Sequence, residues 1–192
     1  MSNLIYTGSS WNFDKLYRMM DACEEIAVND MGLDCFPNQI EIIKMIRKFK
    51  PEIVLCNSID DRHIDHPKGS KLVSDACFLS GLRKIETKLE ENIQDAWRPK
   101  LVYHYIQWKN IEPDFVVDVT GFVEKKIDAV SAYSSQFYDQ NSKEPETPIT
   151  SKNFIDSINY RARDLGRLIN VEYAEGFTTE RYVAVENLDK LI

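Results

Sequence analysis

Residues 52–80 read EIVLCNSIDDRHIDHPKGSKLVSDACFLS, and this stretch decides the expected fold. The apolar run IVLC at 53–56 is typical of a short buried strand, and a polar loop follows it. Beyond Pro67, apolar residues recur at helical spacing, at Leu72, Val73, Ala76 and Leu79. A strand, a polar loop and a helix in this order predict one unit of an α/β fold.

The rest of the chain continues the alternation of helices and strands. Helical spacing occurs in four further segments, at 14–29, 39–48, 123–137 and 154–169. Strand patterns occur at LVYHYIQ (101–107) and DFVVDV (114–119), and the apolar run RYVAV (181–185) follows the last helix. The sequence therefore predicts an α/β layered domain with a mainly parallel sheet.

Composition excludes several classes of protein. The chain has 192 residues with a formal net charge of -7, and its four cysteines form no C-x-x-C pair. Nucleic-acid binding requires basic clusters, so no nucleic-acid partner is expected, and the basic group KMIRKFK (44–50) is interpreted as a solvated helix face. No apolar stretch approaches the roughly 20 residues of a membrane helix, and the start has no signal-peptide pattern. We expect a cytoplasmic protein that does not contact a membrane.

Two of the three histidines lie in the polar loop, where His63 and His66 flank Asp65. Imidazole is a common zinc ligand, and a neighbouring carboxylate can fix its tautomer. Loops beyond the carboxyl ends of strands are also where α/β proteins gather their chemistry. The stretch supplies at most two of the roughly three ligands that a catalytic zinc needs. A polar loop whose histidines bond to the backbone is therefore an open alternative.

A second short motif is a weaker match. The metallo-β-lactamase signature H-x-H-x-D-H would require a histidine where Asp61 stands, and His104 is the single histidine available downstream.

Longer stretches carry a more specific resemblance. These are IIKMIRKFKPEIVLCNSIDDRHIDH, KLVYHYIQWKNIEPDFVVDVTGF, ETPI and RARDLGRLINVEYAEGF. Through them, residues 40–186 resemble the PIG-L/LmbE-like zinc deacetylases of the bacillithiol-biosynthesis type. The resemblance implies a Rossmann-like three-layer fold. It also implies zinc-dependent hydrolysis of the N-acetyl group of a small N-acetylglucosaminyl compound, with malate as the aglycone in bacillithiol synthesis.

The resemblance also implies roles for single residues. His66 corresponds to a zinc ligand. His63 corresponds to the group that steadies the oxyanion or protonates the leaving amine, with Asp65 orienting it. Arg62 and Tyr173 are candidates for substrate binding, and Tyr173 matches a family tyrosine near the mouth of the site.

The family's first motif, A-H-P-D-D, is absent from this sequence. In the family it supplies the two other zinc ligands and the aspartate base. Residues 7–43 instead resemble the beginning of SpoVR-like proteins, through WNFD (11–14) and LDCFPNQIEII (33–43). We therefore expect a SpoVR-like helical segment over 1–39, joined to a truncated deacetylase domain over 40–192 that lacks the opening strands. A divergent start with an accidental likeness is the alternative.

The missing motif leaves two functional hypotheses. One is a zinc deacetylase whose activity is impaired, and the other is a non-catalytic fused remnant that acts as an interaction protein. Loss of opening strands would expose a sheet edge, and such an edge favours pairing with another copy of the chain. A homo-oligomer is therefore a further expectation.

Overall fold

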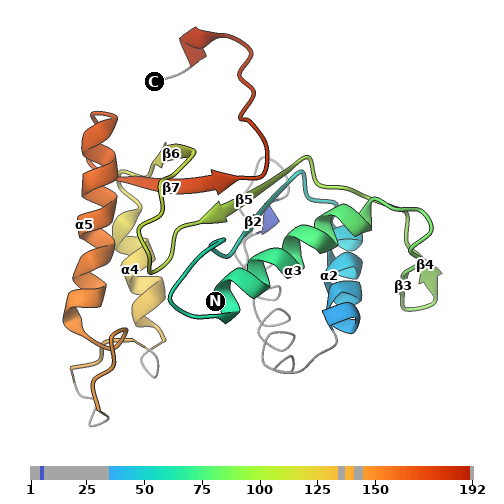
Figure 1. Ribbon diagram of the computed structural model, residues 1–192, viewed down its shortest axis with the longest axis horizontal. Helices are drawn as coiled ribbons and strands as arrows, with labels where there is room; N and C mark the ends of the chain where they lie inside the picture. Colours follow the sequence, from blue (N-terminus) through green and yellow to red (C-terminus); the bar gives the residue numbers. More distant parts are fainter. Residues whose placement is uncertain (1–4, 7–34, 134–136, 141–144, 191–192) are drawn as a thin grey trace. The chain divides into compact units, whose positions relative to one another are not determined.

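The computed structural model describes residues 5–6, 35–133, 137–140 and 145–190 (Figure 1). The predicted helix over 14–29 lies outside the described residues, as does nearly all of the predicted segment 1–39. Contacts divide the chain into two compact units. The first comprises the described residues up to Glu112 together with Phe177–Val183, and the second comprises Pro113–Gly176 and the described residues from Ala184 onward.

The first unit contains most of the sheet. Its helices and strands are β1 (Ile5–Tyr6), α2 (Cys35–Phe49), β2 (Ile53–Cys56), α3 (Asp65–Ser80), β3 (Lys88–Leu89), β4 (Asn92–Ile93) and β5 (Leu101–Tyr105). The second unit contains β6 (Phe115–Asp118), α4 (Val123–Ser131), α5 (Lys152–Leu168) and the short 3-10 helix η1 (Leu188–Lys190). Strand β7 (Ala174–Thr179) begins in the second unit and ends in the first.

The parallel pair of strands, β2 and β5, lies at the centre of the sheet in the first unit. Its register runs from Ile53↔Leu101 to Cys56↔His104. Strand β1 pairs with the other side of β2, and β7 pairs with the other side of β5, both in antiparallel orientation. The predicted α/β class is confirmed. The parallel pair is formed by the strands expected at IVLC (53–56) and LVYHYIQ (101–107).

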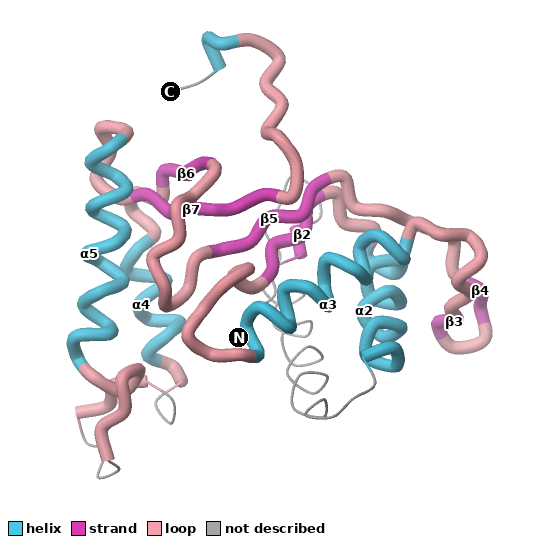
Figure 2. Tube along the Cα trace, in the orientation of Figure 1, coloured by secondary structure: helices cyan, strands magenta, loops and turns pink. Residues whose placement is uncertain are grey.

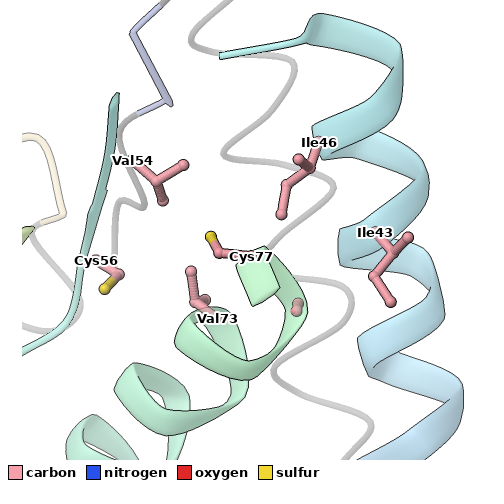
Figure 3. Close-up of a cluster of buried hydrophobic side chains, with 7 residues drawn as sticks. Ile43, Ile46, Val54, Cys56, Val73 and Cys77 are labelled. Carbon is pink, nitrogen blue, oxygen red and sulfur yellow. The ribbon is translucent and has the colours of Figure 1, made fainter. Parts of the chain in front are cut away.

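The core of the first unit is built from three elements. Helices α2 and α3 lie side by side and pack with β2 (Figure 2). Their apolar side chains meet in the cluster of Figure 3, which comprises Ile43, Ile46, Val54, Cys56, Val73, Ala76 and Cys77. Residues of α2 and α3 enter the cluster at helical spacing, which is why the sequence periodicity located both helices.

Arg47 corrects the interpretation of the basic group on α2 as a solvated face. Its side chain is buried, with the residue 3% exposed, and no carboxylate contacts it among the described residues. The guanidinium instead donates to three backbone carbonyls, those of Ser80, Leu82 and Ile85, and to the hydroxyl of Thr87. A cation among carbonyls at the carboxyl end of α3 also complements the helix dipole.

Helix α3 begins at Asp65, two residues before Pro67, although the sequence analysis placed its start after the proline. Proline is tolerated in a first helical turn because the amide that it lacks has no intrahelical partner there. His66 therefore lies on a helix and not in the loop.

Three segments after residue 119 differ from the sequence expectation. Helix α4 ends at Ser131, short of the expected 137, and strand β7 runs over a segment, Ala174–Thr179, for which no strand was named. Residues 181–185 are not a strand. Helix α5 agrees with its periodicity and begins at a Ser151 cap, which accepts a hydrogen bond from the Phe154 amide at 3.2 Å. In the described part of the chain, no helix is long and apolar enough to cross a membrane.

Candidate functional site

Two loops that follow the parallel strands are joined by one carboxylate. Asp61 lies in the loop after β2, and its Oδ1 accepts hydrogen bonds from the backbone amides of Arg62 (2.8 Å), Trp108 (3.1 Å) and Lys109 (3.0 Å). Trp108 and Lys109 lie in the loop after β5. Because the carboxyl ends of parallel strands meet at one edge, these two loops are neighbours, and Asp61 fixes their separation.

The second oxygen of Asp61 holds His66. His66 is in the first turn of α3 and is 9% exposed, and its Nδ1 contacts Asp61 Oδ2 in a short hydrogen bond. An ionised carboxylate can only accept, so Nδ1 carries the proton of a neutral ring and Nε2 carries the lone pair. Nε2 is buried and has no hydrogen-bond partner among the described residues. The His66 ring therefore presents a metal-binding lone pair in a fixed direction.

The ionised state of Asp61 follows from its surroundings. Burial alone would raise the pKa of this carboxyl, but the hydrogen bonds from His66 and from three backbone amides outweigh burial, so its pKa lies below the usual value. Asp61 is therefore a stable acceptor for the imidazole proton at neutral pH.

His63 and Asp65 are exposed beside His66. The ring centroids of His63 and His66 are 5.4 Å apart. Nδ1 of His63 accepts a hydrogen bond from the Asp65 amide at 3.3 Å and lies 3.5 Å from Oδ2 of the Asp65 carboxylate. Both contacts of Nδ1 come from Asp65, and they favour opposite tautomers because the amide donates while the carboxylate accepts.

The two expected substrate-binding residues fall in different units. In the first unit, the guanidinium carbon of Arg62 lies 5.1 Å from the ring centroid of Trp108, a cation–π arrangement. In the second unit, Tyr173 is half-buried beside Arg163, whose guanidinium carbon is 5.3 Å from the tyrosine ring. The structure thus brings together His63, Asp65, His66 and Arg62, while Tyr173 belongs to the other unit.

His66 and Asp61 fit one ligand position of a zinc site. His66 supplies a correctly oriented nitrogen, with a carboxylate behind it, as in many zinc centres. Over the residues that the structure describes, however, no group of three or more His, Cys, Asp or Glu side chains could hold a metal ion. Asp60, which could have been a further ligand, is engaged by Lys109 Nζ at 2.7 and 2.9 Å.

Sequence reasoning missed the role of Asp61. It assigned no role to Asp61, and the orienting carboxylate that the resemblance implied, Asp65, was assigned to His63 and not to His66. The available signal was its position five residues before His66, within a polar loop that must turn back to start α3. A carboxylate there can reach the first helical turn.

The environment of His104 was also missed. His104 is 3% exposed, and its Nδ1 lies 2.8 Å from Ser70 Oγ and 3.0 Å from the Asn57 carbonyl oxygen. Its Nε2 lies 3.2 Å from Glu180 Oε1. Both ring nitrogens thus have protein partners, which disfavours the metallo-β-lactamase interpretation because that interpretation needs His104 as a ligand.

No protein-family model matches the chain. Among solved structures, a conserved protein from Thermus thermophilus is similar with a TM-score of 0.66 and 23% identity, covering 94% of this chain and 80% of the other. The 4-carboxy-2-hydroxymuconate hydratase from Pseudomonas putida has a TM-score of 0.60 and 19% identity, with coverages of 96% and 80%.

A third similar structure is the N,N'-diacetylchitobiose deacetylase from Pyrococcus horikoshii, with a TM-score of 0.60, 20% identity and coverages of 95% and 72%. One of these proteins is a hydratase and another a deacetylase, so the architecture alone does not select a reaction. At these identities the likeness establishes architecture, and the chain has the α/β, Rossmann-like fold that these three proteins share.

Proposed function

We propose that this chain is a zinc-deacetylase-type hydrolase for a small N-acetylglucosaminyl compound, N-acetylglucosaminyl-malate in bacillithiol biosynthesis, and that its activity is impaired. The observation that carries the proposal is the buried Nε2 of His66, which has no hydrogen-bond partner among the described residues and is aimed by the Asp61 contact. The fold shared with a chitobiose deacetylase supports the proposal.

The residues of the first unit take separate roles in this proposal. His66 binds zinc through Nε2, and Asp61 holds the ring in the required tautomer. When bound, zinc supplies a Lewis acid that polarises the amide carbonyl and acidifies a water molecule. In this proposal His63 donates a ring proton to the oxyanion or the leaving amine, and Asp65, which contacts its Nδ1, orients it. Arg62 is proposed to contact substrate. For Tyr173, in the second unit, substrate contact rests on the family resemblance alone.

The impairment follows from what the sequence lacks. Without A-H-P-D-D, the family's aspartate base and two of its three metal ligands are absent. Zinc affinity depends on several donors acting together, so a site with His66 alone binds weakly. General base catalysis typically contributes about 10²- to 10⁴-fold, and this factor is lost as well. In this proposal a SpoVR-like segment over 1–39 replaces the part of the domain that would supply these groups.

The test compares the chain with a repaired chimera, in which a segment bearing A-H-P-D-D replaces residues 1–39. Release of free amine from N-acetylglucosaminyl-malate is measured with added zinc. We expect background turnover from the chain, robust turnover from the chimera, and loss of that turnover in the chimera with His66→Ala. Robust turnover by the unrepaired chain would contradict the impairment. An inactive, folded chimera would contradict the deacetylase assignment.

A second candidate is a non-catalytic protein that acts by interaction. The observation that favours it is that the described residues hold no group of three or more potential metal ligands. In that case the chimera would stay inactive, and the chain would form an assembly, for which a homo-oligomer is the simplest form. Analytical ultracentrifugation of the full chain at several concentrations tests this candidate directly.

A further inference from the structure

A buried polar cluster lies beneath the start of α3. It consists of His104 on β5, Ser70 on α3, the Asn57 carbonyl after β2, and Glu180 after β7; we call it the His104 cluster. Ser70 and His104 are 2% and 3% exposed. The Cys56 thiol sulfur also lies 3.2 Å from Nδ1 of His104. Three other segments of the first unit thus converge on the imidazole ring that β5 carries.

A hydrolytic role for this cluster is disfavoured by its burial. A serine hydroxyl, an imidazole and a carboxylate in series are the parts of a Ser-His-acid triad. The hydroxyl of such a triad must reach a substrate carbonyl, however, and Ser70 is buried almost completely. The cluster is therefore more simply explained by what it holds in place.

Ser70 lies one helical turn after His66, on the same buried face of α3. The preceding residue at the helix start, Ile64, provides no side-chain cap. The start of α3 is therefore held by two polar contacts from outside the helix. Asp61 holds His66, and His104 holds Ser70. Because His104 also contacts the Asn57 carbonyl, it ties the helix to the carboxyl end of β2.

We infer that His104 is a positioning residue for His66, acting through Ser70. The ring anchors the first two turns of α3 against the end of β2 and so fixes where Nε2 of His66 points. The inference rests on the proposed function in one respect, because the direction of Nε2 matters for zinc binding only if His66 is a zinc ligand. The positioning itself is a property of the metal-free chain and can be measured there.

The readout is the tautomer of His66, followed by long-range ¹H–¹⁵N correlation of the histidine rings at one fixed pH without metal. The chain has only three histidines, so a His63→Gln and a His66→Gln variant together assign all three rings. In the unmodified chain we expect one His66 tautomer, with the proton on Nδ1. In Ser70→Ala we expect the two ring nitrogen signals of His66 to move toward each other, because the Asp61 contact is no longer fixed.

Two matched variants complete the design. Ser70→Thr keeps the hydroxyl and should retain the His66 signals of the unmodified chain. Ser74→Ala removes a half-buried serine one turn further along α3 and should change neither ring nitrogen. If Ser70→Ala lowers stability but leaves the His66 signals unchanged, the cluster is merely structural and the inference is overturned. Glu180→Gln, at a partly exposed side chain, gives a milder perturbation of the same cluster should Ser70→Ala not fold. In that variant too, unchanged His66 signals overturn the inference.

Zinc binding provides the second arm. In the repaired chimera, Ser70→Ala should weaken zinc affinity about 10- to 100-fold, as loss of outer-shell support typically does. A chimera that binds no zinc would defeat the proposed function, while the tautomer result on the metal-free chain would stand. Unchanged zinc affinity in a folded Ser70→Ala chimera would defeat the positioning inference alone.

Discussion

Asp61 and Trp108 join the loops that follow two parallel strands, because the Asp61 carboxylate accepts a hydrogen bond from the Trp108 amide at 3.1 Å. The same carboxylate holds His66, so the geometry of the loops and the direction of the imidazole are coupled. Four donors converge on two oxygens of a single side chain.

Replacing Asp61 with Asn should reverse the tautomer of His66. The three backbone amides require an acceptor, so the Asn oxygen faces them and its NH₂ faces the imidazole. Nδ1 must then accept, which places the proton on Nε2 and removes the lone pair that the proposed zinc site would use. Ring nitrogen shifts report this reversal, and unfolding in urea should show a loss of about 1–3 kcal/mol. Asp60→Asn, at an exposed ion pair, should cost about 0–1 kcal/mol and leave the tautomer unchanged.

Arg47→Met should be strongly destabilising although both side chains have long apolar stems. It removes a guanidinium that donates to the Ser80, Leu82 and Ile85 carbonyls, and a buried group without its partner costs about 1–3 kcal/mol. We expect a loss of roughly 2–4 kcal/mol in urea unfolding, in line with this mechanism. Lys48→Met, at the exposed neighbouring position, is the control. Equal effects of the two substitutions would contradict the capping role.

Ile46→Ala tests the core of Figure 3. Ile46 lies on α2, is 1% exposed and belongs to the cluster with residues of α3 and β2. Truncation therefore leaves a cavity that the helices fill only partly. The expected loss is about 2–5 kcal/mol by chemical denaturation. Ile93, which is 69% exposed on β4, provides the comparison, and Ile93→Ala should change stability by less than about 0.5 kcal/mol.

The two buried cysteines should resist thiol reagents in the native state. Burial raises the pKa of the Cys77 thiol to about 12 and raises that of Cys56 as well. An unfolded thiol titrates near 8.5, so the stability that these thiols contribute is fully present below about pH 8.5 and is lost as pH rises toward about 12. A variant that carries both Cys23→Ser and Cys35→Ser keeps Cys56 and Cys77 as its two remaining thiols. At about pH 8 it should react with a disulfide reagent only after denaturation; rapid native labelling would contradict the assigned burial.

The sequence was most informative where apolar spacing met a clear boundary. The apolar pattern indicated helices α2, α3 and α5 and strands β2, β5 and β6. The start of α3 lies earlier than expected because a proline fits the first helical turn. Strand β7 was not predicted, because AEGFTT (174–179) contains two small residues and alternates weakly. Its pairing with β5 is a long-range choice that local patterns do not encode.

At the candidate site, the residue types were predictable and their partners were not. His63, Asp65 and His66 were found from composition and spacing in one loop. The partnership of Asp61 with the Trp108 amide, and that of Ser70 with His104, join residues more than thirty positions apart. Such contacts depend on which strands lie side by side, and this is decided by the assembled sheet.

The contacts of Asp61 also show how local in the sequence the surroundings of His66 are. All described contacts of the His66 ring, and those that fix Asp61 in turn, come from residues 61–109. The direct contacts of this imidazole in the described residues thus come from one short stretch of the chain, and Asn57 and Glu180 add support through His104. In the proposed zinc site this stretch would supply one ligand, so every further donor would have to come from other segments of the chain.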